Sequence, residues 1–308
     1  MALDERGYFD IQINGYKGVD FHKDDLSGEE LRGVCEALNA DGNDGILLTI
    51  TTEKLEFMTA RLARVAKLRA QDKRLQSMIW GIHVEGPFLN ERPGYKGAHP
   101  EDAIHPANVE EMKRLLDAAD GLVRLVTLAP ERDPGFATTK YLHGKGVVVS
   151  AGHCDPSLDE LKAAIDAGVS MFTHLGNGCP MQMHRHDNIV QRALSLYKHL
   201  WLCFIPDGAH VAFPALGNYL RAAGFERTIV VTDAIAAAGM GPGTYKLGRW
   251  TLTLGEDMVA RAPDGSHLVG AAITMPQCEK NLVEKVGLSR EDARRLLVAN
   301  PRIAFGLD

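Results

Sequence analysis

The sequence predicts an α/β fold of the (β/α)8 or TIM-barrel type, and two observations support this prediction. Apolar runs of strand character alternate with helical patterns, as expected for repeated βα units. Four of the runs end in a metal-binding or proton-transferring side chain, and barrel enzymes carry their catalytic residues at the carboxyl ends of several strands. Barrels of this type form one domain, so we expect a single domain over residues 1–308.

Eight strands are expected, which is the number that such a barrel contains. They are Tyr8–Ile13, Gly45–Ile50, Met78–His83, Leu122–Leu128, Val147–Ala151, Ser170–Thr173, Trp201–Ile205 and Thr228–Thr232. The helices expected between them include Gly28–Asn39, Leu55–Ala70, Asn108–Ala118, Ser157–Ala167 and Phe213–Ala223. Ser157 and Glu160 have the spacing of a capping box, which supports a helix start at this point.

The pattern changes after the eighth expected strand. Two short strands are expected within Thr244–Leu254, joined by a turn at Gly248-Arg249, and Asp264-Gly265 marks another turn. We interpret this segment as a β excursion in the last βα connection. The helices expected to close the barrel are Met275–Val286 and Ser289–Val298.

Composition and charge narrow the class of partner. The net charge is −6 and the isoelectric point is near 6.1, with no basic cluster, which argues against nucleic acid or an anionic membrane as a partner. No apolar run approaches the roughly 20 residues of a membrane span, and residues 1–6 lack an apolar signal core. The five scattered cysteines are typical of reduced thiols. We therefore expect a cytoplasmic protein with a small-molecule substrate.

Three strand-end residues are candidate metal ligands. Glu85 precedes Gly86-Pro87, which turns the chain out of the strand and leaves the carboxylate at the rim. His153 and His174 lie about one βα unit apart, which places them on neighbouring strands facing the same mouth. Each residue alone could be a buried structural histidine or a capping glutamate. Together they form a set that can bind one divalent ion.

Asp233 ends the eighth strand and is the candidate general base and acid, the alternative being a cap on the next helix. Gln12 and Asn14 stand where two histidines would create a second metal site. Amides are poor ligands for transition metals, so we expect one ion, with Gln12 holding a water near it. We expect zinc, although iron, manganese and cobalt suit the same ligands.

Loops after the third, sixth and seventh strands carry polar residues that can contact a substrate: His99, Asn177, Arg185 and His210. An arginine fork suits an oxyanion such as phosphate, although most arginines and histidines in surface loops are simply solvated. Further candidates of lower rank are His184, His186 and His267. Cys154 and Cys179 flank the site, but no nearby base pattern indicates a thiol nucleophile.

Several motifs resemble those of the N-acetylglucosamine-6-phosphate deacetylases of the amidohydrolase superfamily. In the order of that family they are 10–15, 83–90, 96–99, 128–131, 151–153, 173–177, 207–210, 232–234, 268–270 and 274–275. The resemblance implies that Glu85, His153 and His174 bind the metal, that Asp233 transfers protons and that His99 lies against the substrate carbonyl. It also implies substrate contacts for Ala98, Asn177, Gly178, Arg185, His210, Leu268, Val269 and Gly270.

Two departures from the family pattern bear on these expectations. The family usually has β-rich segments before the first barrel strand and after the last helices, so its small β-sandwich domain is expected to be missing here. Uncovered barrel surface then predicts a homo-oligomer, most simply a dimer. In the family, Arg185 and His210 would meet the phosphate and can come from a neighbouring subunit. The family's Arg-Glu-Pro-Gly run is Arg185-His186-Asp187-Asn188 here, which bears on recognition of the phosphate.

The predicted reaction is metal-dependent hydrolysis of the N-acetyl group of N-acetylglucosamine 6-phosphate or a close N-acyl amino sugar. A divalent ion would polarise the carbonyl and acidify water, and Asp233 would transfer the proton. One alternative is an amidohydrolase that acts on another N-acyl or cyclic amide. Another is a non-catalytic barrel that binds a sugar phosphate, which would bind sugar without a metal.

Overall fold

The computed structural model describes residues 6–307, so the prediction about the first six residues lies largely outside the described residues. Eight parallel strands form one sheet, and all eight expected strands are confirmed. In sheet order they are β1 (Tyr8–Ile13), β4 (Asn43–Thr51), β5 (Ile79–Glu85), β6 (Val123–Leu128), β7 (Val148–Ala151), β8 (Val169–Phe172), β9 (Trp201–Phe204) and β10 (Thr228–Val230). A bridge between Ile13 and Ala234 joins the two edges, so the barrel is nearly closed.

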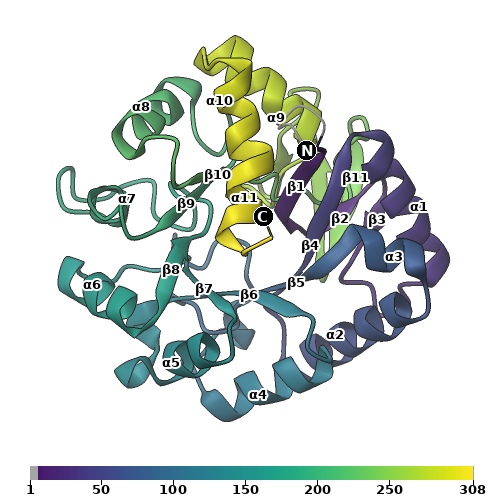
Figure 1. The fold of residues 1–308 in the computed structure, drawn as a ribbon, viewed down its shortest axis with the longest axis horizontal. Helices are drawn as coiled ribbons and strands as arrows, with labels where there is room; N and C mark the ends of the chain where they lie inside the picture. Colours follow the sequence, from purple (N-terminus) through teal and green to yellow (C-terminus); the bar gives the residue numbers. More distant parts are fainter. Residues whose placement is uncertain (1–5, 308) are drawn as a thin grey trace.

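Helices surround this barrel, and Figure 1 shows them as an outer ring around the strands. The helices between the strands are α1 (Gly28–Ala40), α2 (Leu55–Ala70), α3 (Lys73–Met78), α4 (Val109–Ala118), α5 (Ala137–Gly144), α6 (Leu158–Ala167), α7 (Ile189–Ser195) and α8 (Phe213–Ala223). The five expected helices are confirmed, and the capping box of Ser157 and Glu160 is present at the start of α6. Three short helices, α3, α5 and α7, were not expected, because six to eight residues carry too little apolar periodicity.

The expected β excursion is a three-stranded antiparallel sheet of β11 (Gly243–Leu247), β12 (Trp250–Leu254) and β13 (Ala260–Arg261). Its turn is attached to the barrel at two points. The Gly248 amide donates to Oδ2 of Asp20 over 2.7 Å in the small ribbon of β2 (Gly15–Tyr16) and β3 (Val19–Asp20). Arg249 Nε is 2.9 Å from Oε2 of Glu53, and Nη1 is 2.8 Å from Oδ1 of Asp102. These contacts hold the excursion over the carboxyl ends of the strands.

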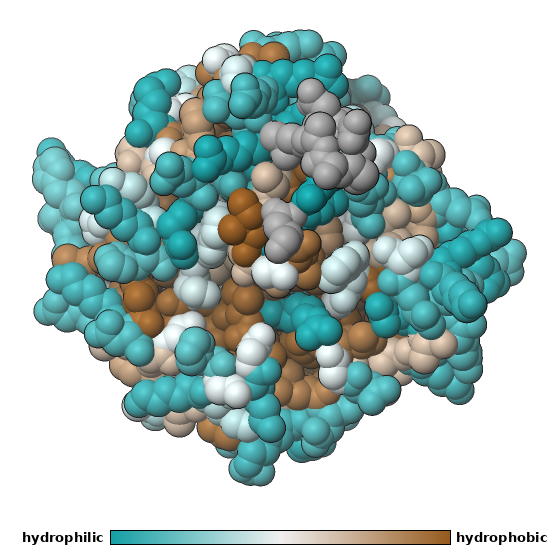
Figure 2. Space-filling model, viewed as in Figure 1, coloured by the Kyte–Doolittle hydropathy of each residue, from teal (hydrophilic) through white to brown (hydrophobic). Residues whose placement is uncertain are grey.

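The closing helices pack against β1 and β10, and the last of them lies at the amino-terminal end of the barrel. They are α9 (Met275–Asn281), α10 (Arg290–Arg294) and α11 (Asn300–Ala304), with helical segments at 282–286 and 295–299 between them. Asn300 Nδ2 donates to the carbonyl of Thr228 over 2.6 Å, which fixes α11 at the start of β10. Figure 2 shows this face with a hydrophilic rim and hydrophobic residues near its centre. Within residues 6–307, no helix has the length and apolarity to cross a bilayer.

Candidate metal centre and active site

The chain turns sharply where it leaves three of the barrel strands. His153, His174 and Asp233 follow β7, β8 and β10, and their φ angles are 50°, 30° and 50°. A non-glycine residue held in this region costs about 1–3 kcal/mol, and such strain gathers at functional sites. Around Asp233, the amide donates to the carbonyl of Gln12 over 3.0 Å and the carbonyl accepts from Ala271 over 2.9 Å. The barrel therefore holds a strained backbone that directs these side chains inward.

Glu85, His153 and His174 meet at one point, as the sequence predicted for neighbouring strand ends. Oε1 of Glu85 is 3.0 Å from Nε2 of His174 and 3.2 Å from Nε2 of His153. The two Nε2 atoms are 3.1 Å apart, and all three residues are buried. One carboxylate oxygen and two imidazole nitrogens in this arrangement are ligands that a divalent transition metal binds.

The hydrogen bonds around His153 indicate that a cation fits between these atoms. Nδ1 of His153 is 2.7 Å from the carbonyl oxygen of Tyr95, and this contact requires the proton on Nδ1. In the neutral ring, Nε2 then presents a lone pair to Oε1 of Glu85. Burial opposes ionisation of Glu85, but the neighbouring imidazoles outweigh burial and hold its pKa well below the usual value, so this oxygen is also an acceptor. An ionised carboxylate oxygen and two imidazole nitrogens that meet at about 3 Å are a donor set that fits a metal ion.

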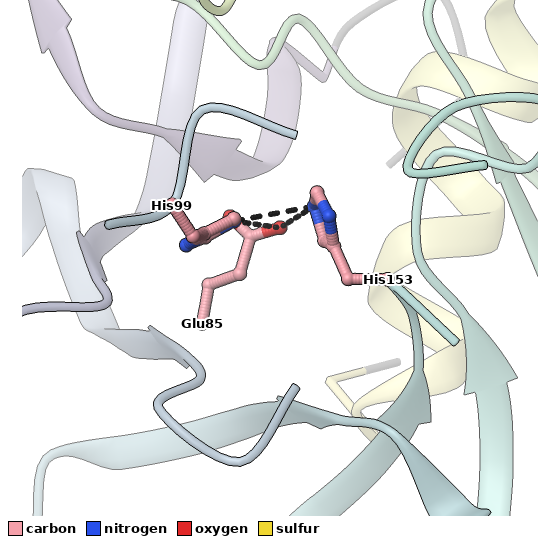
Figure 3. A group of neighbouring side chains, drawn as sticks. All are labelled: Glu85, His99 and His153. Atoms are coloured by element: carbon pink, nitrogen blue, oxygen red, sulfur yellow. Dashed lines mark hydrogen bonds and ion pairs between the residues drawn. The ribbon is translucent and has the colours of Figure 1, made fainter. Parts of the chain in front are cut away.

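His99 joins this group from the loop after β5. Its Nε2 is 3.2 Å from Nε2 of His153 and 3.8 Å from Oε1 of Glu85, and Figure 3 shows these three side chains pointing toward one another. Burial and the nearby His153 lower the pKa of His99 to about 4, so its ring is neutral at pH 7. A Cβ on Gly178, where φ is 59°, would lie 2.8 Å from Nδ1 of His153. Only glycine permits this close approach to the ring.

Asp233 lies beside this candidate metal site and is held by two amides. Asn14 Nδ2 donates to Oδ1 of Asp233 over 2.7 Å, and Gln12 Nε2 is 3.2 Å from the same oxygen. Gln12 Nε2 is also 3.2 Å from Oε2 of Glu85, so this amide bridges the two carboxylates. Burial and the charge of Glu85 raise the pKa of Asp233 to about 6. A carboxyl group with this pKa can both accept and return a proton near neutral pH.

A cavity of about 1040 Å³ opens above these residues. Most of the predicted site residues line it: Asn14, Glu85, Ala98, His99, His153, His174, Asn177, Gly178, His210, Asp233, Leu268 and Gly270. His267, a lower-ranked candidate, also lines it, and the β11–β13 sheet supplies one wall through Leu247, Gly248, Arg249 and Trp250.

Two predicted substrate contacts lie away from the cavity wall. Val269 is fully buried in the small core of the β11–β13 sheet, because its side chain faces opposite to that of its cavity-lining neighbour Leu268. Arg185 is exposed in the loop before α7, where His184 and His186 are exposed as well. Gln12 does not line the cavity. Its Nε2 contacts Oδ1 of Asp233, and Asp233 does line the cavity. For these positions, residue type and loop could be predicted from the sequence, but side-chain direction could not.

Sequence reasoning missed three polar residues that organise the site. Asp207 Oδ2 is 2.6 Å from Nδ1 of His210, and it leaves the other ring nitrogen for the cavity. Their i, i+3 spacing was the signal that could have predicted the pair. His22 lines the cavity and is 2.9 Å from Oδ1 of Asp20. Asp10 accepts the Thr232 hydroxyl over 2.5 Å beside Asp233, and although it begins the 10–15 motif, nothing in the sequence indicated this partner.

The cysteines near the site have little nucleophilic character, in agreement with the prediction. All five cysteines of the chain are free. Burial raises the pKa of the Cys179 thiol to about 11 and that of Cys154 well above its usual value. At neutral pH both groups are therefore protonated thiols, and Cys179 is a neutral part of the cavity wall.

No protein-family model matches the chain. The chain is 30% identical to an N-acetylgalactosamine-6-phosphate deacetylase of Escherichia coli O157:H7, an alignment that covers 98% of this chain and 78% of the relative. It is also 30% identical to an N-acetylglucosamine-6-phosphate deacetylase of Bacillus subtilis, with 98% and 75% of the two chains covered.

Solved structures give the same result. The N-acetyl-D-glucosamine-6-phosphate deacetylase of Mycobacterium smegmatis, solved as a mutant in complex with N-acetyl-D-glucosamine-6-phosphate, is similar at a TM-score of 0.89 and 32% identity. That alignment covers 98% of this chain and 77% of the other. The enzyme from Thermotoga maritima is similar at a TM-score of 0.86 and 27% identity, over 98% and 79% of the two chains. On these similarities, the chain belongs to the N-acetylglucosamine-6-phosphate deacetylase family of the amidohydrolase superfamily.

Proposed function

We propose that this protein hydrolyses the N-acetyl group of N-acetylglucosamine 6-phosphate, or of a close N-acyl amino sugar, and releases acetate. The observation that carries the proposal is the meeting of Glu85, His153 and His174 at one point, with Asp233 held beside them. Binding alone does not require a proton-transferring carboxylate at this position. The similarity to deacetylases over nearly the whole chain supports the same reaction.

Glu85, His153 and His174 would hold one divalent ion. Such an ion, when bound, polarises the amide carbonyl of the substrate and acidifies water. The side chains at Gln12 and Asn14 are amides that donate to carboxylates, which supports one ion rather than two. Zinc is our first choice, and iron, manganese or cobalt would fit the same donors.

Asp233 would move the proton. Both amide donors, from Asn14 and Gln12, point to Oδ1, so Oδ2 is the oxygen that takes a proton from the attacking water. The raised pKa of about 6 makes this carboxyl a base that is ionised at pH 7 and can return the proton. The proton goes back from Oδ2 to the amine nitrogen as the carbon–nitrogen bond breaks, which yields acetate and the free amino sugar.

His99 would stabilise the oxygen of the substrate carbonyl. It lines the cavity, and its Nε2 lies 3.2 Å from Nε2 of His153. A neutral imidazole can donate one hydrogen bond to an oxygen that gains negative charge during attack. Asn177 and Gly178 lie on the same cavity wall, where they would contact the sugar and its acyl group.

The charge of the cavity suits an anionic substrate. Its wall carries three positive side chains, Arg61, Lys96 and Arg249, and three negative ones, Glu53, Glu85 and Asp233. A divalent ion adds two positive charges to this balanced set and makes the site attractive to a phosphate ester. His210, held by Asp207, would add a hydrogen-bond donor for the phosphate.

We also propose a homodimer in which Arg185 reaches the phosphate of a substrate in the neighbouring subunit. The exposure of Arg185 in its own chain supports this proposal, because the guanidinium is available to another surface. The five free cysteines support a cytoplasmic location, since reducing compartments keep thiols unpaired.

A deacetylation assay with two epimers tests the substrate. The chain is equally identical to a galactosamine-type and a glucosamine-type enzyme, so N-acetylgalactosamine 6-phosphate is the second candidate. Acetate release from either phosphate by metal-loaded protein, and slower release from the plain sugars, would support the proposal. Hydrolysis of plain N-acyl or cyclic amides alone would point to a different amidohydrolase activity.

A further inference from the structure

We infer that Thr127 is a positioning residue that sets where all three proposed metal ligands lie. It stands in β6, between β5 and β7 in the sheet, and supplies none of the ligands itself. Its side chain is fully buried and does not line the cavity. The inference rests on the proposed metal-dependent function and assigns a role to a residue that acts only through its neighbours.

Hydrogen bonds join Thr127 to the residues next to two of the ligands. Its backbone carbonyl accepts from the amide of Gly86, the residue after Glu85, over 2.9 Å. Its Oγ1 is 2.7 Å from Oγ1 of Thr173, the residue before His174. The backbone and the side chain of one residue therefore hold the chain beside Glu85 and beside His174.

Packing joins Thr127 to the residue next to the third ligand. A Cβ on Gly152, which precedes His153, would lie 2.6 Å from Cγ2 of Thr127 and 3.0 Å from Cβ of Thr173. Both separations are too short for non-bonded carbon atoms, so the backbone at Gly152 packs directly on the two threonines. Thr127 is thus in contact with a chain neighbour of every proposed ligand.

The Thr127 hydroxyl is also part of a buried chain of polar contacts that crosses the strands. Its Oγ1 is 2.8 Å from Nε2 of His83 in β5, and Oγ1 of Thr173 is 2.6 Å from Oγ of Ser150 in β7. All four side chains are buried, in a barrel interior that is usually filled by branched apolar residues. A buried polar group without a partner is costly, so these contacts fix the strands relative to one another.

This support bears on the metal site because the site depends on the positions of separate strand ends. The three ligand atoms of Glu85, His153 and His174 lie 3.0–3.2 Å apart, so a shift of one strand end changes two of these separations. The φ angles of His153 and His174 are 50° and 30°, and such conformations persist only where the surroundings hold them. Thr127 provides this hold at the adjacent residues, which keeps the donor atoms close enough for one ion.

Thr127→Val tests the inference because valine keeps the shape of the side chain and removes the hydroxyl. Competition with a chelator measures the affinity for cobalt(II) without any turnover. We expect Thr127→Val to weaken cobalt binding by about 10-fold, the lower end of the range for losing a residue that supports metal ligands. Thr127→Ser retains the hydroxyl and should bind cobalt nearly as tightly as the wild type. If Thr127→Val does not fold, Thr173→Val removes the same hydrogen bond from its other end and should give the same loss.

The matched control is Thr228→Val at the start of β10. Thr228 is equally buried, and its Oγ1 donates to the carbonyl of Gly224 over 2.7 Å. Thermal unfolding of the metal-free proteins should show a loss of stability in both valine variants, whereas Thr228→Val should keep the wild-type affinity for cobalt. An unchanged affinity in Thr127→Val, or an equal loss in Thr228→Val, would overturn the inference alone. A wild-type protein that binds no cobalt would remove the metal centre of the proposed function, and the inference with it.

Discussion

The side-chain amide of Asn14 donates a hydrogen bond to Asp233, with Nδ2 2.7 Å from Oδ1. Gln12 Nε2 is 3.2 Å from the same oxygen and 3.2 Å from Oε2 of Glu85. Gln12 in β1 therefore links the carboxylates of Glu85 and Asp233, and Asn14, directly after β1, adds a second donor to Asp233. They occupy one oxygen of Asp233 and stabilise its ionised form.

Replacing Asn14 by Leu should shift the pH dependence of the reaction. Asp233 acts as a base only when ionised, so kcat/KM falls as the pH drops through its pKa. Burial and Glu85 raise that pKa to about 6, and a nearby cation lowers it again. Loss of the Asn14 donor, worth about 1.5–3 kcal/mol to a charged acceptor, should raise it by about one to two units. The pH below which kcat/KM falls should therefore increase. An unchanged pH profile of kcat/KM would contradict this role of Asn14.

Asp233→Asn should keep the metal and lose turnover. The amide preserves the shape of the side chain but cannot take a proton from water. General base catalysis contributes roughly 10²- to 10⁴-fold, so kcat should fall by about that factor. The check is kcat together with metal content in the same sample. Near-normal kcat in a metal-loaded variant would remove Asp233 from the mechanism.

The protein should bind one equivalent of divalent ion per chain. Elemental analysis after reconstitution and desalting measures this number. His153→Ala and His174→Ala should each lose the ion and the activity together, because each would supply one of the three proposed ligand atoms, which lie 3.0–3.2 Å apart. His210→Ala serves as the matched control and should keep the ion, since its ring is paired with Asp207. Two equivalents with full activity would show that Gln12 and Asn14 do not exclude a second metal.

The strand ends could be predicted from the sequence because barrel topology places them together. Glu85, His153, His174 and Asp233 each follow an apolar run, and parallel strands bring such positions to one mouth. The side-chain partners could not be predicted in the same way. Asp10, for example, meets Thr232 only because β1 and β10 are neighbours across the seam of the barrel.

The direction in which loop side chains point could not be predicted from the sequence either. Leu268 and Gly270 line the cavity while Val269 between them is buried in another core, a difference that depends on how the β11–β13 sheet docks. The exposed Arg185 lies in the loop before α7, where Asp187 Oδ1 accepts from Nε of Arg192 in α7 over 2.6 Å. Local sequence patterns do not indicate that these residues come into contact.

Arg185→Ala should reduce kcat/KM for a phosphorylated substrate far more than for the plain sugar. A charged hydrogen bond to phosphate is worth about 1.5–3 kcal/mol, which predicts a loss of roughly 10- to 100-fold. Because Arg185 is exposed in its own chain, the effect requires a dimer. Mixed dimers of Arg185→Ala and Asp233→Asn chains should regain activity through the site that has both intact residues. Equal losses on both substrates, or a fully active monomer by light scattering, would contradict the shared site.

Acetate release from N-acetylglucosamine 6-phosphate by the metal-reconstituted protein tests the central claim most directly. The measurement follows acetate and free amine together, before and after chelation and after the ion is restored. We predict equal amounts of the two products, loss of both on chelation, and recovery with one equivalent of divalent ion. A protein that holds one ion at Glu85, His153 and His174 and binds the sugar phosphate, yet releases no acetate, would contradict the account.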